Sequence, residues 1–305
     1  LSYFDSLDES EMGSTFYYYI LADFKSGLTS VELAVTQSVT ILFTIPGSYD
    51  NIQAGIDNSI DGDSINVATG TYMESIDFTG KKIKLKCQGQ SRECILDGNN
   101  SETIITFSSN EDNTTILDGF TIQNGSSNDE FYGGGMTIRS DPLIQNCTFI
   151  SNTAYRGGAV FLREAAEPSF IGCNFENNTS TKNGGAIYCY RDATPTFNNC
   201  EFTENQSLEG NGGALCLNEA TPTITNCVFS NNQVNGSILI DDDGFGGAIY
   251  IYDIFTGLTF DNCSFDNNTA ETGGAVYIDD ARNIEFRQCQ FFENLGNYGG
   301  GLYLN

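Results

Sequence analysis

Acidic side chains are the most abundant chemically active groups in this sequence. Its 305 residues include 40 Asp and Glu, 13 Lys and Arg and no His, for a formal net charge of −27. Two carboxylates about 5 to 9.5 Å apart can cleave a glycosidic bond, and clustered carboxylates can bind a hard cation such as Ca²⁺. With 40 acids some pairs meet the first distance by chance, so their number alone does not predict an enzyme.

One run of carboxylates is a candidate cation site. Asp241, Asp242 and Asp243 follow one another in a segment that we expect to be a loop. A Ca²⁺ site is one interpretation of this run. We favour a solvated charged turn, because the run lacks the spaced Asp-x-Asp pattern with a Gly that is typical of calcium loops. No other cofactor is predicted.

Eight of the ten cysteines divide into two kinds. Cys87 and Cys94 flank a polar turn, and we expect a disulfide between them, which is typical of a secreted protein. Six others recur at a fixed place in a repeat, where a thiol behaves as a small buried apolar group. Metal binding by these six cysteines is disfavoured, because the sequence has no His and no pair of closely spaced Cys-x-x-Cys motifs.

An internal repeat organises the chain from about residue 133 onward. Each unit has a Cys, a Phe two residues later, an Asn five residues after the Cys, and then a double glycine. The units begin at Cys147, Cys173, Cys200, Cys227, Cys263 and Cys289. Between the fourth and fifth units lies an insertion, Gln233–Phe245, which we expect to loop out of one corner without disturbing the repeat.

The repeat predicts a parallel β-solenoid. Each unit carries two strand signals, one after the glycines and one around the Cys-x-Phe step, and no helical period is present. Stacked coils need the same chemistry at each level, so we expect inward columns of aliphatic residues, of Cys and Phe, and an Asn ladder from Asn152 to Asn294. The glycines suit corners that need a positive φ or a close backbone approach. A further column, from Phe161 and Tyr188 to Tyr303, faces outward; these rings either stack on a ligand or, as we favour, on one another.

The segment TIPGSYDNIQAGIDNSIDGDSINVATGTY, at 44–72, resembles the opening of right-handed parallel β-helix proteins of the pectin-lyase-like superfamily. The resemblance implies an all-β, single-stranded right-handed parallel β-helix (solenoid) over 44–305, with a short N-terminal capping helix that contains Ile52 and Ile56. The Gly-Gly-Ala and Cys-x-Phe-x-x-Asn units resemble the repeats of polymorphic outer-membrane protein adhesins. This fold hosts lyases, hydrolases, adhesins and structural proteins.

The motifs of the enzymes in this superfamily are missing. The polygalacturonase-like members carry Gly-His-Gly and Arg-Ile-Lys motifs, and this sequence has neither. Lyase-like members use a basic residue as proton acceptor; the candidates are Arg139, Arg156, Arg163, Arg191 and Arg282, and none lies in a recognisable motif. A polysaccharide lyase or glycoside hydrolase therefore remains the alternative function.

Residues 1–43 form an N-terminal extension outside the repeat. Alternating apolar residues predict strands, and we expect them either to pair with the open edge of a neighbouring molecule or to cover the chain's own solenoid. The first arrangement gives a head-to-tail homo-oligomer or fibre. The residues assigned to this assembly are Val31, Leu33, Val35, Val39, Ile41 and Phe43, together with Leu302 and Leu304 of the last coil.

The composition and the N-glycosylation sequons also indicate where the protein is located and which class of function it has. The acidic charge argues against nucleic acid as a partner, and no apolar run is long enough to span a membrane. Loops carry candidate N-glycosylation sites at Asn99, Asn113, Asn124 and Asn235. We therefore expect an extracellular or cell-surface protein, a non-enzymatic structural or adhesive subunit of a fibre or surface layer.

Overall fold

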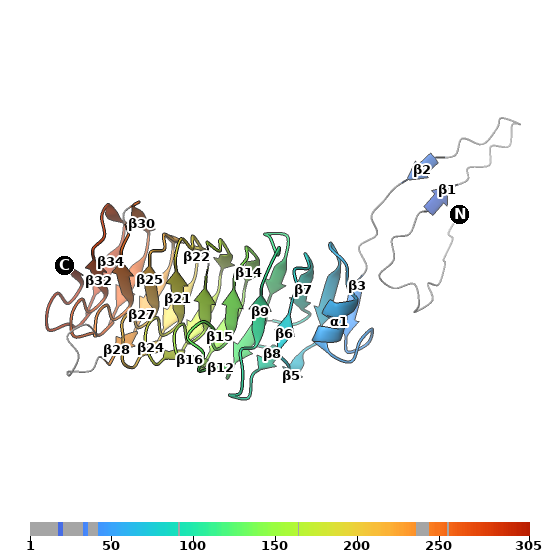
Figure 1. Cartoon of the computed structure of the whole chain (residues 1–305), viewed down its shortest axis with the longest axis horizontal. Coiled ribbons are helices and arrows are strands. Elements are labelled where there is room, and N and C mark those ends of the chain that lie inside the picture. Colours follow the sequence, from blue (N-terminus) through green and yellow to red (C-terminus); the bar gives the residue numbers. More distant parts are fainter. Residues whose placement is uncertain are drawn as a thin grey trace, which may run out of the picture.

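A parallel β-solenoid forms the body of the protein (Figure 1). The computed structural model describes residues 18–20, 33–35, 42–90, 92–163, 165–235, 244–254 and 256–305. The first turn contributes one strand, and each later turn contributes a strand to each of three long sheets; five turns also contribute to a short fourth sheet. The strand pairs of these four sheets are parallel, as in Leu162 beside Cys189. The predicted right-handed parallel β-helix is confirmed.

Two of the long sheets follow the chain from one coil to the next. The first sheet contains β3 (Leu42–Ile45), β4 (Ser64–Val67), β7 (Lys84–Cys87), β10 (Ile116–Asp118), β14 (Leu143–Gln145), β18 (Ser169–Ile171), β22 (Thr196–Asn198), β26 (Thr223–Thr225), β30 (Leu258–Asp261) and β33 (Ile284–Arg287). The second sheet contains β5 (Gly70–Tyr72), β8 (Cys94–Asp97), β11 (Phe120–Gln123), β15 (Thr148–Ile150), β19 (Asn174–Glu176), β23 (Glu201–Thr203), β27 (Val228–Ser230), β31 (Ser264–Asp266) and β34 (Gln290–Phe292).

The third sheet follows the double glycines. It contains β6 (Ile76–Asp77), β9 (Ile105–Phe107), β13 (Met136–Ile138), β17 (Val160–Leu162), β21 (Ile187–Tyr190), β25 (Leu215–Asn218), β29 (Ile249–Tyr252), β32 (Val276–Asp279) and β35 (Leu302–Leu304). The short fourth sheet lies between the second and third in each coil and contains β12 (Ser126–Ser127), β16 (Thr153–Ala154), β20 (Thr179–Ser180), β24 (Gln206–Ser207) and β28 (Gln233–Val234).

The prediction of two strands per unit found the second and third sheets but missed the other two. Strands of the first sheet, such as β22 and β26, are rich in Thr and Asn and follow a Pro, so they look like turns in the sequence. Strands of the fourth sheet are two residues long. Both are held by pairing with the neighbouring coil, a tertiary effect that overrides local propensity.

The interior consists of repeated columns of side chains. In the second sheet the Phe rings stack at 4.7–5.0 Å between centroids with interplanar angles of 5–8°. The inward aliphatic column from Val160 to Val276 is fully buried. Equal spacing of the coils lets each ring lie on the ring below, so identical residues at each level are the best packing.

The predicted Asn ladder is present. The side-chain amide of each Asn donates to Oδ1 of the Asn in the next coil at 2.9–3.0 Å. The same amide donates to a backbone carbonyl of the preceding coil, as from Asn178 to Phe149 O. The column comprises Asn152, Asn178, Asn205, Asn232, Asn268 and Asn294. These buried polar groups are therefore satisfied by one another and by the backbone.

The two glycines of each pair have different tasks. The first adopts a positive φ between 61° and 69°, as at Gly184 (68°), which glycine allows at little cost. The second lies where a Cβ would overlap the carbonyl oxygen of its counterpart in the next coil, as Gly185 would overlap Gly213. Both explanations offered by the sequence, positive φ and close approach, are confirmed at adjacent positions.

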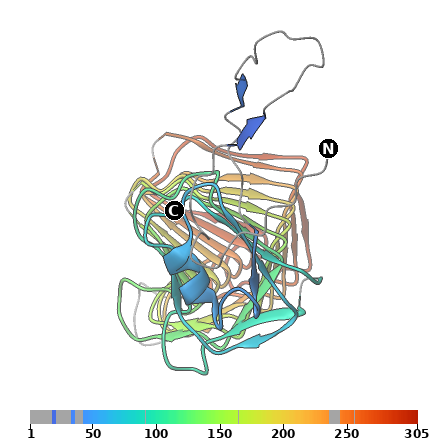
Figure 2. The same cartoon turned by 90° about the vertical axis from the view of Figure 1, so that its right-hand side faces the viewer.

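A short helix covers the first coil. Helix α1 (Ile52–Asn58) buries Ile52 and Ile56 against the solenoid, and Figure 2 shows it in front of the coils. The side chain of Asn51 accepts a hydrogen bond from Ala54 N at 2.8 Å, which caps the helix N-terminus. The carboxylate of Glu74 accepts hydrogen bonds from the backbone N–H groups of Ile52 and Gln53, both at 3.0 Å.

The solenoid begins two residues before the predicted boundary of 44. Strand β3 begins at Leu42 and pairs with β4, so Phe43 lies fully buried in the first coil. Two short strands precede it, β1 (Tyr18–Ile20) and β2 (Leu33–Val35), which pair with each other in antiparallel register.

Candidate functional site

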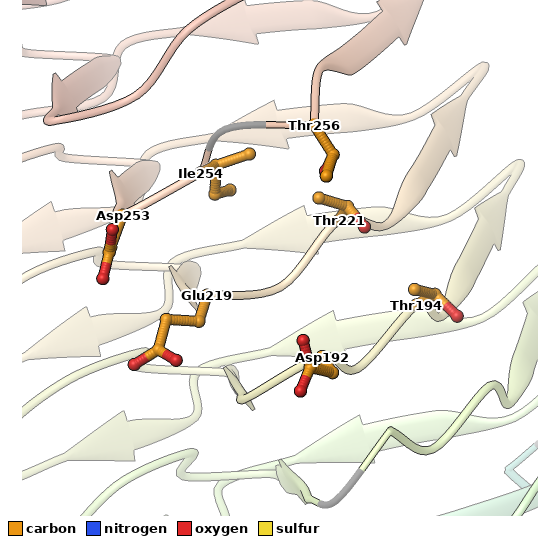
Figure 3. Close-up of a pocket in the computed structure, with 7 residues that line it drawn as sticks. All are labelled: Asp192, Thr194, Glu219, Thr221, Asp253, Ile254 and Thr256. Atoms are coloured by element: carbon orange, nitrogen blue, oxygen red, sulfur yellow. The ribbon is translucent and has the colours of Figure 1, made fainter.

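An acidic hollow of about 520 Å³ lies at the corner that follows the third sheet (Figure 3). Three successive coils line it, each with one carboxylate and one Thr. The carboxylates and the Thr residues form two rows that run from coil to coil. The lining residues are Asp192, Thr194, Glu219, Thr221, Asp253, Ile254 and Thr256.

A left-handed turn positions each carboxylate of the hollow. Asp192, Glu219 and Asp253 have φ of 55°, 55° and 57°; Asp192 lies two residues after β21, and Glu219 and Asp253 directly follow β25 and β29. Neighbouring turns hydrogen-bond through the backbone: Asp192 N donates to Glu219 O at 2.8 Å, and Glu219 N donates to Tyr252 O at 3.1 Å. The spacing of the carboxylates is thus set by the spacing of the coils.

The hollow presents a negatively charged surface. None of the described residues that line it is basic, so it attracts cationic groups or hydroxyl donors. Within the part of the chain that the structure describes, no group of three His, Cys, Asp or Glu is arranged to hold a metal ion. The predicted cation candidates Asp241, Asp242 and Asp243 lie outside the described residues.

Arginines and aromatic rings occupy the neighbouring coils on the same side. The guanidinium of Arg163 lies 4.7 Å from the ring centroid of Phe131, and that of Arg191 lies 4.8 Å from Tyr190. Arg139 lies 5.9 Å from the ring of Tyr132. Such contacts hold the planar guanidinium in place over the ring.

The outward aromatic column stacks on itself, as favoured from the sequence. Tyr250 and Tyr277 lie 5.7 Å apart, and Tyr277 and Tyr303 lie 5.2 Å apart. Phe161, Tyr188 and Tyr277 are buried although they face outward. Residues between the fourth and third sheets cover them, since Phe245 stacks on Tyr277 at 4.4 Å and Arg156 lies over Tyr188 at 5.6 Å. Burial raises the pKa of Tyr188 and Tyr250.

The column cysteines are buried thiols, and the predicted disulfide lies apart from them. Cys87 and Cys94 are bonded, with 5.8 Å between their Cα atoms. In the column, the thiol of Cys173 donates to Ile144 O at 3.5 Å, and the other members make equivalent contacts. Burial raises the pKa of the Cys147 thiol to about 12, so this group is protonated and unreactive at neutral pH.

The last coil carries a cluster of exposed apolar side chains. Phe292 is 62% exposed, Leu295 66%, Tyr298 64% and Leu304 65%. Strands β33, β34 and β35 are the end strands of their sheets. Of the other predicted assembly residues, Leu302 is in β35, Leu33 and Val35 are in β2, and Val31, Val39 and Ile41 lie outside the described residues.

The candidate glycosylation sites differ in exposure. Asn99, Asn113 and Asn235 are exposed. Asn124 is half-buried, and its side-chain amide donates to both carboxylate oxygens of Asp97 at 3.1 and 3.0 Å. These hydrogen bonds, with those from Gln123 and Asn99, lower the pKa of Asp97 although burial opposes them. Among the described residues no helix is long and apolar enough to cross a membrane.

The stacked coils, capping helix and interior ladders define a right-handed β-helix repeat protein. The model of the family described as the right handed beta helix region matches residues 51–252 and 143–305, and the chain belongs to this family. Among solved structures, the chain is similar to a pectin methylesterase mutant in complex with hexasaccharide IV, with 8% identity, a TM-score of 0.33 and coverage of 84% of this chain and 82% of that one. The sequence matches none of the curated proteins.

The sequence motifs predict neither the hollow nor the charges beside it. Arg139, Arg163 and Arg191 are predicted only as candidate proton acceptors, and the prediction does not include Asp192, Glu219 or Asp253. A signal is present, because all six follow a strand of the third sheet by one or two residues. Aligning the repeats on the residues after this strand would have revealed it.

Proposed function

We propose that this chain is a secreted, non-enzymatic structural and adhesive protein, a subunit of an extracellular fibre or surface layer. The observation that carries the proposal is the continuity of the interior: the Asn ladder and the Phe stack run through consecutive coils without a break. A body whose coils repeat the same contacts is a stiff rod with a regular surface, which suits a structural element.

The assembly that we propose is head-to-tail. The last coil offers unpaired strand edges and exposed apolar side chains, including Leu302 at 36% and Leu304 at 65% exposure. Strand edges of this kind accept a further strand from another molecule. Residues 1–41 of a second copy are the proposed donor, and β1 and β2 show that this segment contains strand-forming sequence. Phe43 is excluded from the contact by its burial.

Negative-stain electron microscopy of the full chain, compared with a variant that lacks residues 1–41, tests this assembly. We expect filaments from the full chain, isolated rods from the truncated chain, and isolated rods from a Leu302→Asp and Leu304→Asp variant. A variant with Lys84→Glu and Lys86→Glu, on the outward side of the first sheet, is the matched control. Filaments that persist without residues 1–41 would refute strand donation.

Cleavage of a polysaccharide is the second candidate, and the acidic hollow favours it. Its carboxylates lie on adjacent coils, whose spacing of about 4.8 Å is near the distances used for glycoside hydrolysis. Incubation with neutral and acidic polysaccharides, followed by detection of reducing ends and of unsaturated products, tests this function. Product formation that is lost in Glu219→Gln would support it, and absence of product from all substrates would remove it.

A further inference from the structure

Four of the seven arginines of the chain lie close together in the middle of the solenoid, in the green to yellow coils of Figure 1. The register of β13, β17 and β21 places Arg139, Arg163 and Tyr190 at the same position on three successive coils. This position is two residues after the outward aromatic column, so these side chains begin on the outward side of the third sheet. Arg191 directly follows Tyr190, and Arg156 lies four residues before β17.

Aromatic rings hold three of these guanidinium groups on the surface, at 4.8 to 5.9 Å from the ring centroids. The rings of Tyr188 and Tyr190 also stack on each other at 5.9 Å, so the contacts join into one packed group. A guanidinium that is already fixed on a ring loses little freedom when it binds a ligand. The arginine patch, as we call this group, comprises Arg139 with Tyr132, Arg156 with Tyr155 and Tyr188, and Arg191 with Tyr190.

The arginine patch has more hydrogen-bond donors than acceptors. Among the described residues, no carboxylate makes an ion pair with Arg139 or Arg191, and Arg156 is paired with Glu130 at 3.6 Å. Nε of Arg139 and Nε of Arg156 are buried without a hydrogen-bond partner among the same residues. Arg163, beside them, makes a further interaction within the chain and is not counted among these donors.

The chain therefore offers the inner side of these guanidinium groups no acceptor, although buried donors are usually satisfied. Their outer N–H groups remain for a partner from outside the chain, since Arg191 is exposed and Arg139 is half-buried. Water satisfies these groups in the free protein. An anion that displaces this water gains charge-assisted hydrogen bonds, which are the stronger kind.

The charge of the surrounding surface confines such an anion to the arginine patch. The protein as a whole carries a net charge of −27 and repels anions elsewhere. The acidic hollow begins at Asp192, the residue after Arg191, and continues over the following coils. An anionic partner is thus attracted at one place and excluded from the coils next to it.

The arrangement of the donors favours a tetrahedral oxyanion. The guanidinium groups of Arg139 and Arg191 come from different coils, and that of Arg156 comes from the segment before a strand. A sulfate or phosphate ester directs its terminal oxygens to several sides, whereas a carboxylate presents two oxygens in one plane. Ring surface is also accessible, because Phe131 is 42% exposed, and the C–H face of a sugar can pack on such a ring.

We propose that the arginine patch binds a sulfate or phosphate ester carried by an extracellular polysaccharide. The ester oxygens accept hydrogen bonds from Arg139 and Arg191, and the sugar packs on the neighbouring aromatic rings. This site supplies the adhesive part of the proposed function and rests on it. The fibre contact uses the last coil instead, so the two contacts can be tested separately.

Equilibrium binding of the full chain to dextran, dextran sulfate and dextran phosphate tests the site, because the three polymers share one neutral backbone. We expect at least one of the esters to bind, with an affinity that falls as salt is added, and dextran not to bind. The preferred ester identifies the source of the oxyanion. Polygalacturonate, which carries only carboxylates, should bind more weakly than that ester.

Two variants of equal charge locate the site. Arg139→Gln with Arg191→Gln should lower the affinity for the preferred ester by about tenfold or more, because charge-assisted hydrogen bonds are lost. Lys84→Gln with Lys86→Gln removes the same charge from the outward side of the first sheet and should leave the affinity nearly unchanged. Thermal unfolding by circular dichroism verifies that each variant is folded.

Four outcomes would overturn the proposal. They are no binding of either ester at low salt, an equal loss of affinity in the two double variants, polygalacturonate that binds as tightly as the esters, and polyglutamate that does so. The last result would assign the arginine patch to acidic proteins. Normal filaments in electron microscopy without ester binding would refute this site and leave the fibre, whereas ester binding by isolated rods would refute the fibre and leave this site.

Discussion

Asn178 gives two hydrogen bonds to a single oxygen atom of Asn205. Its backbone N–H and its side-chain amide both donate to Oδ1 of Asn205 at 3.0 Å. Asn205 in turn donates its own amide to Phe175 O at 2.8 Å, and both Asn side chains are fully buried. The ladder therefore binds backbone to side chain as well as side chain to side chain, one coil to the next.

Asn205→Ala should destabilise the unglycosylated protein by roughly 3 kcal/mol or more, because the four hydrogen bonds of this buried side chain are lost. Urea unfolding measured by circular dichroism gives the change. Asn198→Ala is the control, since Asn198 accepts an exposed hydrogen bond from Asn226 at 3.2 Å, and should cost less than about 1 kcal/mol. Equal costs for the two variants would show that the ladder is energetically unimportant.

Gly185→Ala should destabilise the solenoid by about 2–3 kcal/mol, because its Cβ would overlap the carbonyl oxygen of Gly213 and the coils would have to separate. Gly301→Ala is the matched control: its Cβ would meet Phe291 no closer than 3.7 Å. Thermal unfolding compares them. A Gly185→Ala protein as stable as wild type would mean that the coil spacing relaxes easily.

Stability should decline as the pH rises above about 9. Burial raises the pKa of Cys147 from 9.0 to about 12 in the folded chain, so the unfolded chain loses this proton first. The contribution of the protonated thiol is complete below pH 9 and is lost as the pH approaches 12, at about 1.4 kcal/mol per pH unit.

Urea unfolding at several pH values above 9 measures this slope. Tyr188 and Tyr250 add to it, because burial raises their pKa above 10.0. Cys147→Ala should make the slope shallower by about 1.4 kcal/mol per pH unit. An unchanged slope in this variant would assign the alkaline loss to other groups.

Expression through a eukaryotic secretory pathway should attach glycans at Asn99, Asn113 and Asn235, whose side chains are exposed. Asn178 and Asn205 also stand in sequons but are buried in the ladder, so folded protein should carry none there. Glycopeptide mass spectrometry measures the glycan occupancy of each site. Folded protein with a glycan on Asn205 would contradict the ladder, and protein without glycans would remove one support for secretion.

The interior of this fold is predictable from sequence because stacking forces repetition. The Cys, Phe and Asn columns and both glycines of each pair could be assigned from spacing alone. The strands of the first sheet could not, since a Thr-Phe-Asn segment after a Pro has the composition of a turn and becomes a strand only through its neighbours.

The outer surface is less predictable than the interior. Tyr188 faces outward by alternation, yet it is 4% exposed because segments from other parts of the coil lie over it. The carboxylates of the acidic hollow escape a search for motifs because they are 27 and 34 positions apart and differ in type. Only the register of the coils brings Arg191 and Glu219 to adjacent levels.

The insertion between β28 and Phe245 leaves the stack beneath it undisturbed. Asn232 still donates to Asn268 at 3.0 Å, and Phe229 still lies on Phe265 at 5.0 Å, across a coil lengthened by this segment. The chain can therefore be lengthened at this corner without a change in how the coils stack. A foreign peptide inserted there would project from the solenoid at one fixed coil. Insertion at the equivalent corner of another coil would place the same epitope at a different position along the solenoid axis.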